Sequence, residues 1–233
     1  KLTKKGKSVN TIKDQLKIPK STVYYHFKKE VGQKQKENAL QIPQNDEVIG
    51  ELCGIFAGDG NFHKKKEGQY RIRFFLNLYD DYYLELADHL EDTLDKRPNV
   101  YTSEAKSLAT LDYSSKKLYK VLKENLEWSE DKTSSIRANT TKTHSPAFRK
   151  GLLRGLIDTD GHREKKFRRY IYGTVSKHLR NDFSDSLSSL GIHHTTYAEE
   201  ATKESWKTMH KVRITGDDAE TFSSKIEPRH PKK

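Results

Sequence analysis

Two aspartates that close two copies of one short motif are the residues of this sequence best placed to do chemistry. Residues 52–60 read LCGIFAGDG and residues 153–161 read LRGLIDTDG, so Asp59 and Asp160 are 101 residues apart (160 − 59). A carboxylate beside the unpaired carbonyl groups at the end of a helix is a suitable ligand set for a hard divalent cation. The repeat therefore predicts a cation site, and the alternative is that each Asp-Gly pair only ends a helix.

The elements that must position these aspartates are two apolar helices. Each copy of the motif has small residues four positions apart, Gly54 and Gly58 in the first and Gly155 and Thr159 in the second. Residues with this spacing share one helix face, and small side chains there let two helices approach closely. We expect the two helices to pack on each other and to bring the two aspartates side by side.

The two runs resemble the paired motifs of the LAGLIDADG homing endonucleases. The second run differs from the family's name only at Arg154 and Thr159, and the first keeps Leu52, Gly54, Asp59 and Gly60. The resemblance extends from about residue 46 to the C-terminus. Residues 113–122, YSSKKLYKVL, are also similar to a lesser motif of single-chain archaeal members.

The resemblance implies a metal-dependent, intron-encoded DNA endonuclease that acts as a monomer with internal pseudo-twofold symmetry. Asp59 and Asp160 would be the essential metal ligands, helped by the carbonyl groups of Gly58 and Thr159. The cofactor would be Mg²⁺ or Mn²⁺, and Ca²⁺ would support binding without cleavage. The substrate would be a long, nearly asymmetric site in double-stranded DNA, hydrolysed once per strand across the minor groove to leave short 3′ overhangs.

The resemblance also implies polar or basic helper residues that position the attacking water. Asn77 in the first half and Thr174 or Ser176 in the second are expected at matching strand ends, and Arg163 and Lys165 follow the second motif. No lysine is visible at a strand end in either half.

Composition points to a polyanionic partner. The 233 residues carry a formal net charge of +11, and residues 1–45, with eleven lysines and three acids, account for +8 of it. An excess of this size favours nucleic acid.

No apolar run approaches the roughly 20 residues of a membrane span, so no membrane partner is expected. The single cysteine, Cys53, excludes an internal disulfide and indicates an intracellular protein, prokaryotic or organellar. The ten histidines lack the paired spacing of a zinc site.

Residues 1–32 resemble a helix-turn-helix of the resolvase-like kind. A short amphipathic helix at 9–16 is followed by a turn at Ile18-Pro19 and by a second, aromatic helix at 23–29. The N-terminal part of such a second helix lies near base edges in the major groove. The expected base-contacting residues are Lys20, Ser21, Thr22, Tyr24 and Tyr25. A helical hairpin with solubilising lysines is the alternative, and residues 33–45 are expected to be a linker.

The remaining chain predicts an α+β fold of two pseudo-symmetric αββαββα halves with antiparallel sheets. The halves are residues 46–125 and 145–233, joined by a connector at 126–144. Alternation along the strands predicts one exposed, DNA-binding face per sheet. In the first half this face would carry Gln69, Arg71, Arg73 and Asn77, with Lys64 just after the motif. In the second half it would carry Arg168, Tyr170, Tyr172, Thr174, Ser176, Lys207, Lys211 and Arg213.

Two other functions stay open for this sequence. A DNA-binding transcriptional regulator could keep the duplicated scaffold without nuclease chemistry, although both aspartates are retained. An intron RNA maturase could use the basic sheets to grip RNA.

Overall fold

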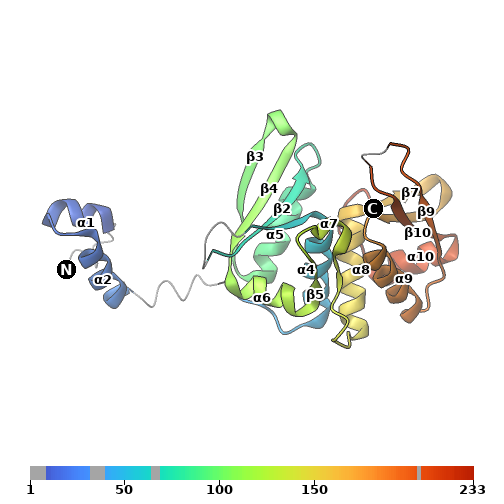
Figure 1. The fold of residues 1–233 in the computed structure, drawn as a ribbon, viewed down its shortest axis with the longest axis horizontal. Helices are drawn as coiled ribbons and strands as arrows, with labels where there is room; N and C mark the ends of the chain where they lie inside the picture. The colour runs from blue at the N-terminus through green and yellow to red at the C-terminus, as the bar shows by residue number, and fades with distance from the viewer. Residues whose placement is uncertain (1–8, 32–39, 64–68, 204–205) are drawn as a thin grey trace. The chain divides into compact units, whose positions relative to one another are not determined.

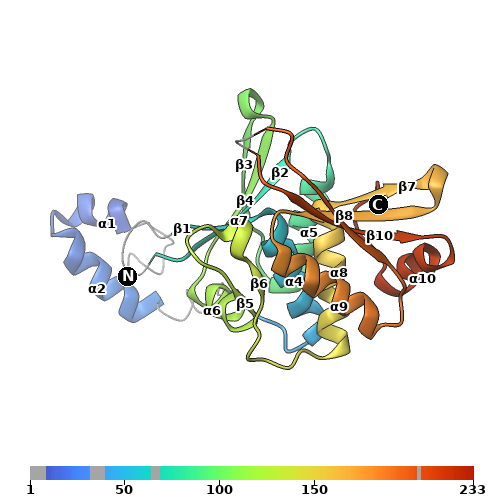
Figure 2. The same ribbon diagram turned by 45° about the vertical axis from the view of Figure 1, so that its right-hand side comes forward.

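The two motif runs form the central pair of helices in the larger of two compact units. The computed structural model describes residues 9–31, 40–63, 69–203 and 206–233. The chain divides into residues 1–41 and residues 42–233. In the larger unit, α4 (Asp46–Asp59) and α8 (Pro146–Asp160) lie side by side in both views (Figures 1 and 2).

Each motif helix begins with a cap that the sequence supplies. The Asn45 side chain accepts hydrogen bonds from the backbone N–H groups of Glu47 and Val48 at the start of α4. The Ser145 side chain accepts from Phe148 N at the start of α8, where Pro146 occupies the first turn. Both helices end at the aspartate, because the next residue, Gly60 or Gly161, already has an extended backbone.

The expected αββαββα order occurs twice. The first half continues with β1 (Gly60–His63), β2 (Arg71–Asn77), α5 (Tyr82–Leu94), β3 (Asn99–Ser103), β4 (Leu108–Ser114) and α6 (Lys116–Asn125). The second continues with β7 (Gly161–Glu164), β8 (Arg169–Thr174), α9 (Lys177–Ser189), β9 (Thr195–Glu199), β10 (Met209–Thr215) and α10 (Asp217–Ile226). The predicted α+β class with antiparallel sheets is confirmed.

The two four-stranded sheets have the same topology. Their strand orders are β1-β2-β4-β3 and β7-β8-β10-β9, and every pairing in them is antiparallel. One face of each sheet is covered by helices. On β2, for example, Ile72 and Phe74 on the covered face are buried, whereas Arg71 and Arg73 on the opposite face are not. The other face is open to a ligand.

The connector between the halves has structure of its own. It contains β5 (Leu126–Glu127), α7 (Lys132–Ser135) and β6 (Arg137–Ala138), and β5 pairs with β6. Ile136 is fully buried and anchors this segment to the second half. The connector therefore holds the residues at the start of α7 in a fixed place.

The described part of the smaller unit contains two helices. They are α1 (Val9–Leu16) and α2 (Lys20–Val31), which bury Ile12 and Val23. None of the described helices is long and apolar enough to span a membrane.

Candidate active site between two helix ends

Close packing of α4 on α8 brings the two motif aspartates together. A Cβ atom at Gly54 would lie 2.5 Å from Leu152 O, and one at Gly155 would lie 2.4 Å from Glu51 O. Real Cβ atoms do not approach other atoms so closely, so the two backbones are in direct contact at these positions. The predicted small-residue interface is present.

The contact continues to the C-terminal ends of both helices. A Cβ atom at Gly58 would lie 2.1 Å from Thr159 Oγ1 and 3.1 Å from Asp160 Oδ2. Desolvation by burial and, after it, the charge of Asp160 raise the pKa of Asp59 to about 7, against the opposing charges of Lys233 and Lys132. Desolvation also raises the pKa of Asp160, although its side chain stays open to solvent. The aspartates thus form a pair whose mutual repulsion a cation would relieve.

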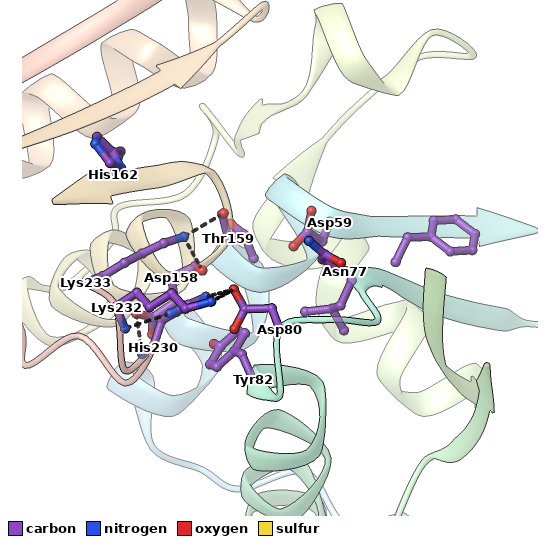
Figure 3. A pocket seen from close by; sticks show the side chains of 12 residues that line it. Asp59, Asn77, Asp80, Tyr82, Asp158, Thr159, His162, His230, Lys232 and Lys233 are labelled. Atoms are coloured by element: carbon purple, nitrogen blue, oxygen red, sulfur yellow. Dashed lines mark hydrogen bonds and ion pairs between the residues drawn. The ribbon is translucent and has the colours of Figure 1, made fainter. Parts of the chain in front are cut away.

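Each helix end is bound by a lysine from elsewhere in the chain. Lys132 Nζ donates to Ala57 O at 2.9 Å. Lys233 Nζ donates to Asp158 O at 2.7 Å and to Thr159 O at 2.9 Å (Figure 3). An ammonium group is favourable there because the last carbonyls of a helix are unpaired and its dipole is negative. Burial lowers the pKa of Lys132 to about 8, against the opposing charges of Asp160 and Asp59.

The two lysines are equivalent in the duplicated fold. Lys132 and Lys233 are 101 residues apart (233 − 132), as are the carbonyls of Ala57 and Asp158 that they bind. Sequence reasoning looked for lysines at strand ends and missed both. The usable signal was the 101-residue offset, extended past the last helix of each half.

A buried charge cluster fixes the two helices beside this site. Arg154, which departs from the family motif, donates through Nη1 to Glu51 Oε2 at 3.2 Å and through Nη2 to Glu47 Oε1 at 2.6 Å. Glu51 also pairs with His89 and Arg229, at 3.0 and 2.6 Å. Burial opposes ionisation of Glu51, but the hydrogen bonds from these partners outweigh it and lower its pKa to about 2.

The segment that carries Lys233 is held on α8 by Asp158. This buried carboxylate accepts hydrogen bonds from the backbone N–H groups of Arg229 and His230 at 3.0 to 3.1 Å. His230 in turn stacks on Tyr82, with ring centroids 4.3 Å apart. Residues 229–233 therefore form one wall of a pocket that opens onto Asp59 (Figure 3).

The donor set suits a magnesium-like ion. Two carboxylates and the neighbouring helix-end carbonyls are hard oxygen ligands, and Mg²⁺ needs only one or two carboxylates when phosphate and water complete its shell. Among the described residues, no group of three or more His, Cys, Asp or Glu side chains is arranged to hold a metal ion. Thr159 O, one of the two predicted carbonyl ligands, accepts from Lys233 in this structure, whereas Gly58 lies at the contact between the helix ends.

The predicted helper residues are distributed unevenly. Asn77 lines the same pocket as Asp59 and lies next to it in Figure 3. Arg163 pairs across the sheet with Tyr170 and lies over its ring, at 5.3 Å from the centroid, so it faces the covered side of the sheet. Lys165 is exposed in the turn between β7 and β8. Of the three, only Asn77 is brought to the site.

The first-half sheet exposes the predicted face. Gln69 and Asn77 are exposed, and Arg71 and Arg73 are partly exposed on either side of the buried Ile72. Arg71 pairs with Asp112 on the adjacent strand. Lys64 lies outside the described residues.

The face predicted for β8 is wrong. Tyr170, Tyr172, Thr174 and Ser176 are between 0 and 8% exposed, and Ile171 and Gly173 occupy the open face instead. The tyrosine rings supply apolar area to the core: Tyr172 stacks on Phe183 and Tyr170 packs on Phe222. These four residues are therefore removed from the DNA-binding set.

Two of the corrected residues have structural partners in place of DNA. The Ser176 hydroxyl accepts from Leu179 N as the N-cap of α9 and donates to Ile136 O at 2.7 Å. Thr174 accepts from Ser176 N. Arg168 lies in the turn before β8 with a left-handed backbone, φ 45°, and pairs with Glu220 and Asp217 of α10.

The predicted basic residues of β10 and its approach do lie on the open side. Lys207 is exposed, and Lys211 and Arg213 are partly exposed on either side of the buried Val212. Lys207 pairs with Asp131 and Lys211 pairs with Glu199, each at 2.6 Å. Arg213 lies over the Tyr197 ring, 4.7 Å from its centroid.

In the smaller unit, the predicted base-contacting residues are all exposed. Lys20, Ser21 and Thr22 in the first turn of α2 are exposed, and so are Tyr24 and Tyr25, at 48 and 66%. The N–H groups of Thr22 and Val23 donate to Pro19 O, which fixes the start of α2 directly after the turn.

Comparison with known proteins identifies the fold. Residues 147–227 match the protein-family model described as LAGLIDADG-like domain. Mesophilic variants of the homing endonuclease I-DmoI superpose with a TM-score of 0.55 at 20% identity, covering 78% of this chain and 95% of theirs. I-DmoI in complex with DNA and Ca superposes with a TM-score of 0.55 at 20% identity, and the match covers 78% of this chain and 89% of I-DmoI. Full-length DUF199/WhiA from Thermatoga maritima gives 0.54 at 16% identity, covering 79% of this chain and 56% of that one. No curated protein matches the sequence.

Proposed function

We propose that this chain is a site-specific DNA endonuclease. It carries a LAGLIDADG-like domain at residues 147–227 and shares its fold with a single-chain, two-motif homing endonuclease. It would hydrolyse one phosphodiester in each strand of a long duplex target. The observation that carries the proposal is the meeting of Asp59 and Asp160 at two adjacent helix ends, each end bound by a lysine.

The aspartates and the helix-end carbonyls would hold the divalent ion. When bound, such an ion neutralises the phosphate, activates water and stabilises the leaving oxygen. I-DmoI structures contain Ca, Mn or Mg together with target DNA. Besides burial, the negative charge of Asp160 raises the pKa of Asp59, and this repulsion between the two carboxylates is the interaction that the ion would relieve. We expect Mg²⁺ or Mn²⁺ to support cleavage and Ca²⁺ to support binding alone.

Lys132 and Lys233 would each serve one helix end. In the absence of substrate their ammonium groups offset the charge of the two aspartates. A phosphate that enters the site adds further negative charge, and an ammonium group within reach stabilises the charge that develops during hydrolysis. Replacing either lysine by methionine keeps the chain length of the side chain but removes this charge. Each replacement should slow cleavage about 100-fold with little change in affinity for the duplex.

The duplex would lie across the open faces of the two sheets, with phosphates near the basic side chains. Arg71 and Arg73 lie on the first sheet, and Lys207, Lys211 and Arg213 on or beside the second. The two-helix unit, in the part of the chain that carries +8 of the net charge, would contact DNA through the start of α2. Tethering a second contact raises overall affinity through effective concentration.

The test is a cleavage assay on a random duplex library, followed by strand-resolved assays on the selected duplex. The wild-type chain should give linear product with Mg²⁺ and a bound, uncut complex with Ca²⁺. Asp59→Asn and Asp160→Asn should each abolish double-strand cutting while Ca²⁺-supported binding survives. Undiminished linear product from both variants would refute the assigned role of the aspartates.

A DNA-binding regulator without nuclease activity is the second candidate. The fold also resembles the LAGLIDADG domain of DUF199/WhiA, with a TM-score of 0.51 at 15% identity, and this chain adds a two-helix unit at its front. In that case the library assay would give salt-sensitive binding to a selected duplex, and no cleavage with Mg²⁺ or Mn²⁺.

A further inference from the structure

The register of the two sheets shows which residues of the halves are equivalent. Gly60, directly after Asp59, pairs with Phe74, and Gly161, directly after Asp160, pairs with Tyr172. Three residues beyond these partners the chain reaches Asn77 in the first half and Val175 in the second. The position that carries an amide in the first half therefore carries an apolar side chain in the second.

The two aspartates consequently face differently equipped pockets. Asp59 shares its pocket with Asn77, whose side chain can both donate and accept hydrogen bonds. Asp160 lines a second pocket that extends over the open face of the second sheet, and Val175 is not among its lining residues. The second pocket lacks the amide that the first one has.

His162 is the polar side chain closest in sequence to Asp160 that lines the second pocket. It stands on β7, pairs across the sheet with Ile171 on the open face, and lines both pockets. Its side chain is exposed (Figure 3), and no hydrogen bond or ion pair joins it to any other described residue. The equivalent residue two positions after Asp59 is Asn61, which does not line the first pocket.

Several charged groups of the second pocket are already engaged in ion pairs. Glu164 accepts from Arg169, Glu199 pairs with Lys211, and Lys207 pairs with Asp131. The imidazole of His162, on the strand that directly follows Asp160, is thus available to water or phosphate without breaking an ion pair.

We infer that His162 is the positioning residue of the second-half site, holding the attacking water by a hydrogen bond in place of the amide that Asn77 supplies in the first half. The inference rests on the proposed endonuclease function. It makes the two strand cleavages depend on different side chains. The first-half cleavage depends on Asn77, and the second-half cleavage on His162.

The experiment measures nicking of each strand separately, with a duplex selected from the random library and labelled on both strands, in Mg²⁺. His162→Ala should slow cleavage of one strand about 10- to 100-fold, the size of effect expected when a reacting group is mispositioned. The other strand should change less than about twofold. Asn77→Ala should slow the opposite strand. Adding Val175→Asn to His162→Ala places an amide at the second-half strand end and should restore much of the lost rate.

Binding of the same duplex in Ca²⁺ and thermal unfolding of each variant serve as controls for folding and affinity. If His162→Ala leaves the cleavage rates of both strands unchanged, or slows both strands equally, the inference is overturned and the endonuclease function still stands. A wild-type chain that binds the duplex but cuts neither strand would overturn the proposed function and this inference with it. If His162→Ala and Asn77→Ala slow cleavage of the same strand, the assignment of one residue to each half-site is also overturned.

Discussion

Replacing Asp59 by asparagine should stabilise the metal-free protein, because burial and the nearby charge of Asp160 disfavour the ionised form of the Asp59 carboxyl in the folded chain. The pKa of Asp59 is about 7 in the folded chain, raised by burial and by Asp160, against about 3.9 in an unfolded chain. Below pH 4 the carboxyl is protonated in both states. As pH rises toward 7 the folded state must release a proton that it binds more tightly, so stability falls.

The magnitude follows from the same pKa difference. A pKa raised by about three corresponds to about 4 kcal/mol of lost stability above pH 7. Because the side chain is partly exposed, screening by solvent reduces this loss to roughly 2 kcal/mol. Asparagine has nearly the same shape and no charge, so Asp59→Asn should recover that amount. For a chain of this size the gain is about 4 to 8 °C in Tm. At pH 5 the gain should be about a third of the gain at pH 8.

The assay is thermal unfolding followed by circular dichroism, in the presence of a chelator, at pH 5 and pH 8. Asp92→Asn, at an exposed position of α5, is the matched control and should show no gain. Adding Mg²⁺ should raise the Tm of the wild-type chain more than that of Asp59→Asn, because only the wild type keeps both carboxylate ligands. A gain of equal size at both pH values, or a loss at pH 8, would refute the electrostatic reasoning.

Four further predictions concern the helix interface and DNA binding. Gly155→Ala places a Cβ atom 2.4 Å from Glu51 O and should cost about 3 kcal/mol or more by urea unfolding, whereas Gly173→Ala, with its nearest neighbour at 3.5 Å, should be neutral. Arg154→Met should lower the free energy of unfolding by about 2 to 4 kcal/mol, because Glu51 keeps His89 and Arg229 as partners but loses the buried Arg154. An unchanged free energy of unfolding would contradict the stabilising role of the Arg154 cluster. If roughly eight phosphates are contacted, log affinity should fall with log salt at a slope near −7. Deleting residues 1–42 should weaken binding and flatten this slope without moving the cleavage position, and an unchanged affinity would exclude the two-helix unit from the complex.

The sequence was sufficient for those parts of the fold that depend on local pattern. Small residues four apart predicted the helix interface, and alternation along residues 69–77 predicted the open face of the first sheet. The same reasoning failed on β8, because a tyrosine is polar at its tip and apolar over its ring. Packing on Phe183 and Phe222 decided which way Tyr172 and Tyr170 face, and that contact is not visible in the strand itself.

Apart from Asn77 on β2, the site was predicted only where its groups lie in the motifs. Asp59 and Asp160 could be placed because helix geometry fixes them at the helix ends. Lys132 meets Ala57 across 75 residues and Lys233 meets Asp158 across the same interval, and neither contact follows from periodicity. Arg154 stood out as a departure from the motif, but its buried partners on the other helix depend on how closely the helices pack.

The Arg154 cluster also determines whether either half can recognise a copy of itself. By the 101-residue offset, the counterpart of Arg154 in the first half is Cys53, and the counterparts of its acceptors Glu51 and Glu47 in the second half are Leu152 and Phe148. Two second halves paired through α8 would bury two arginines against apolar side chains, and two first halves would bury their glutamates with no arginine from α8. Divergence after duplication has therefore made the halves obligate, complementary partners, and a separated half is expected to bind its opposite rather than to form a homodimer.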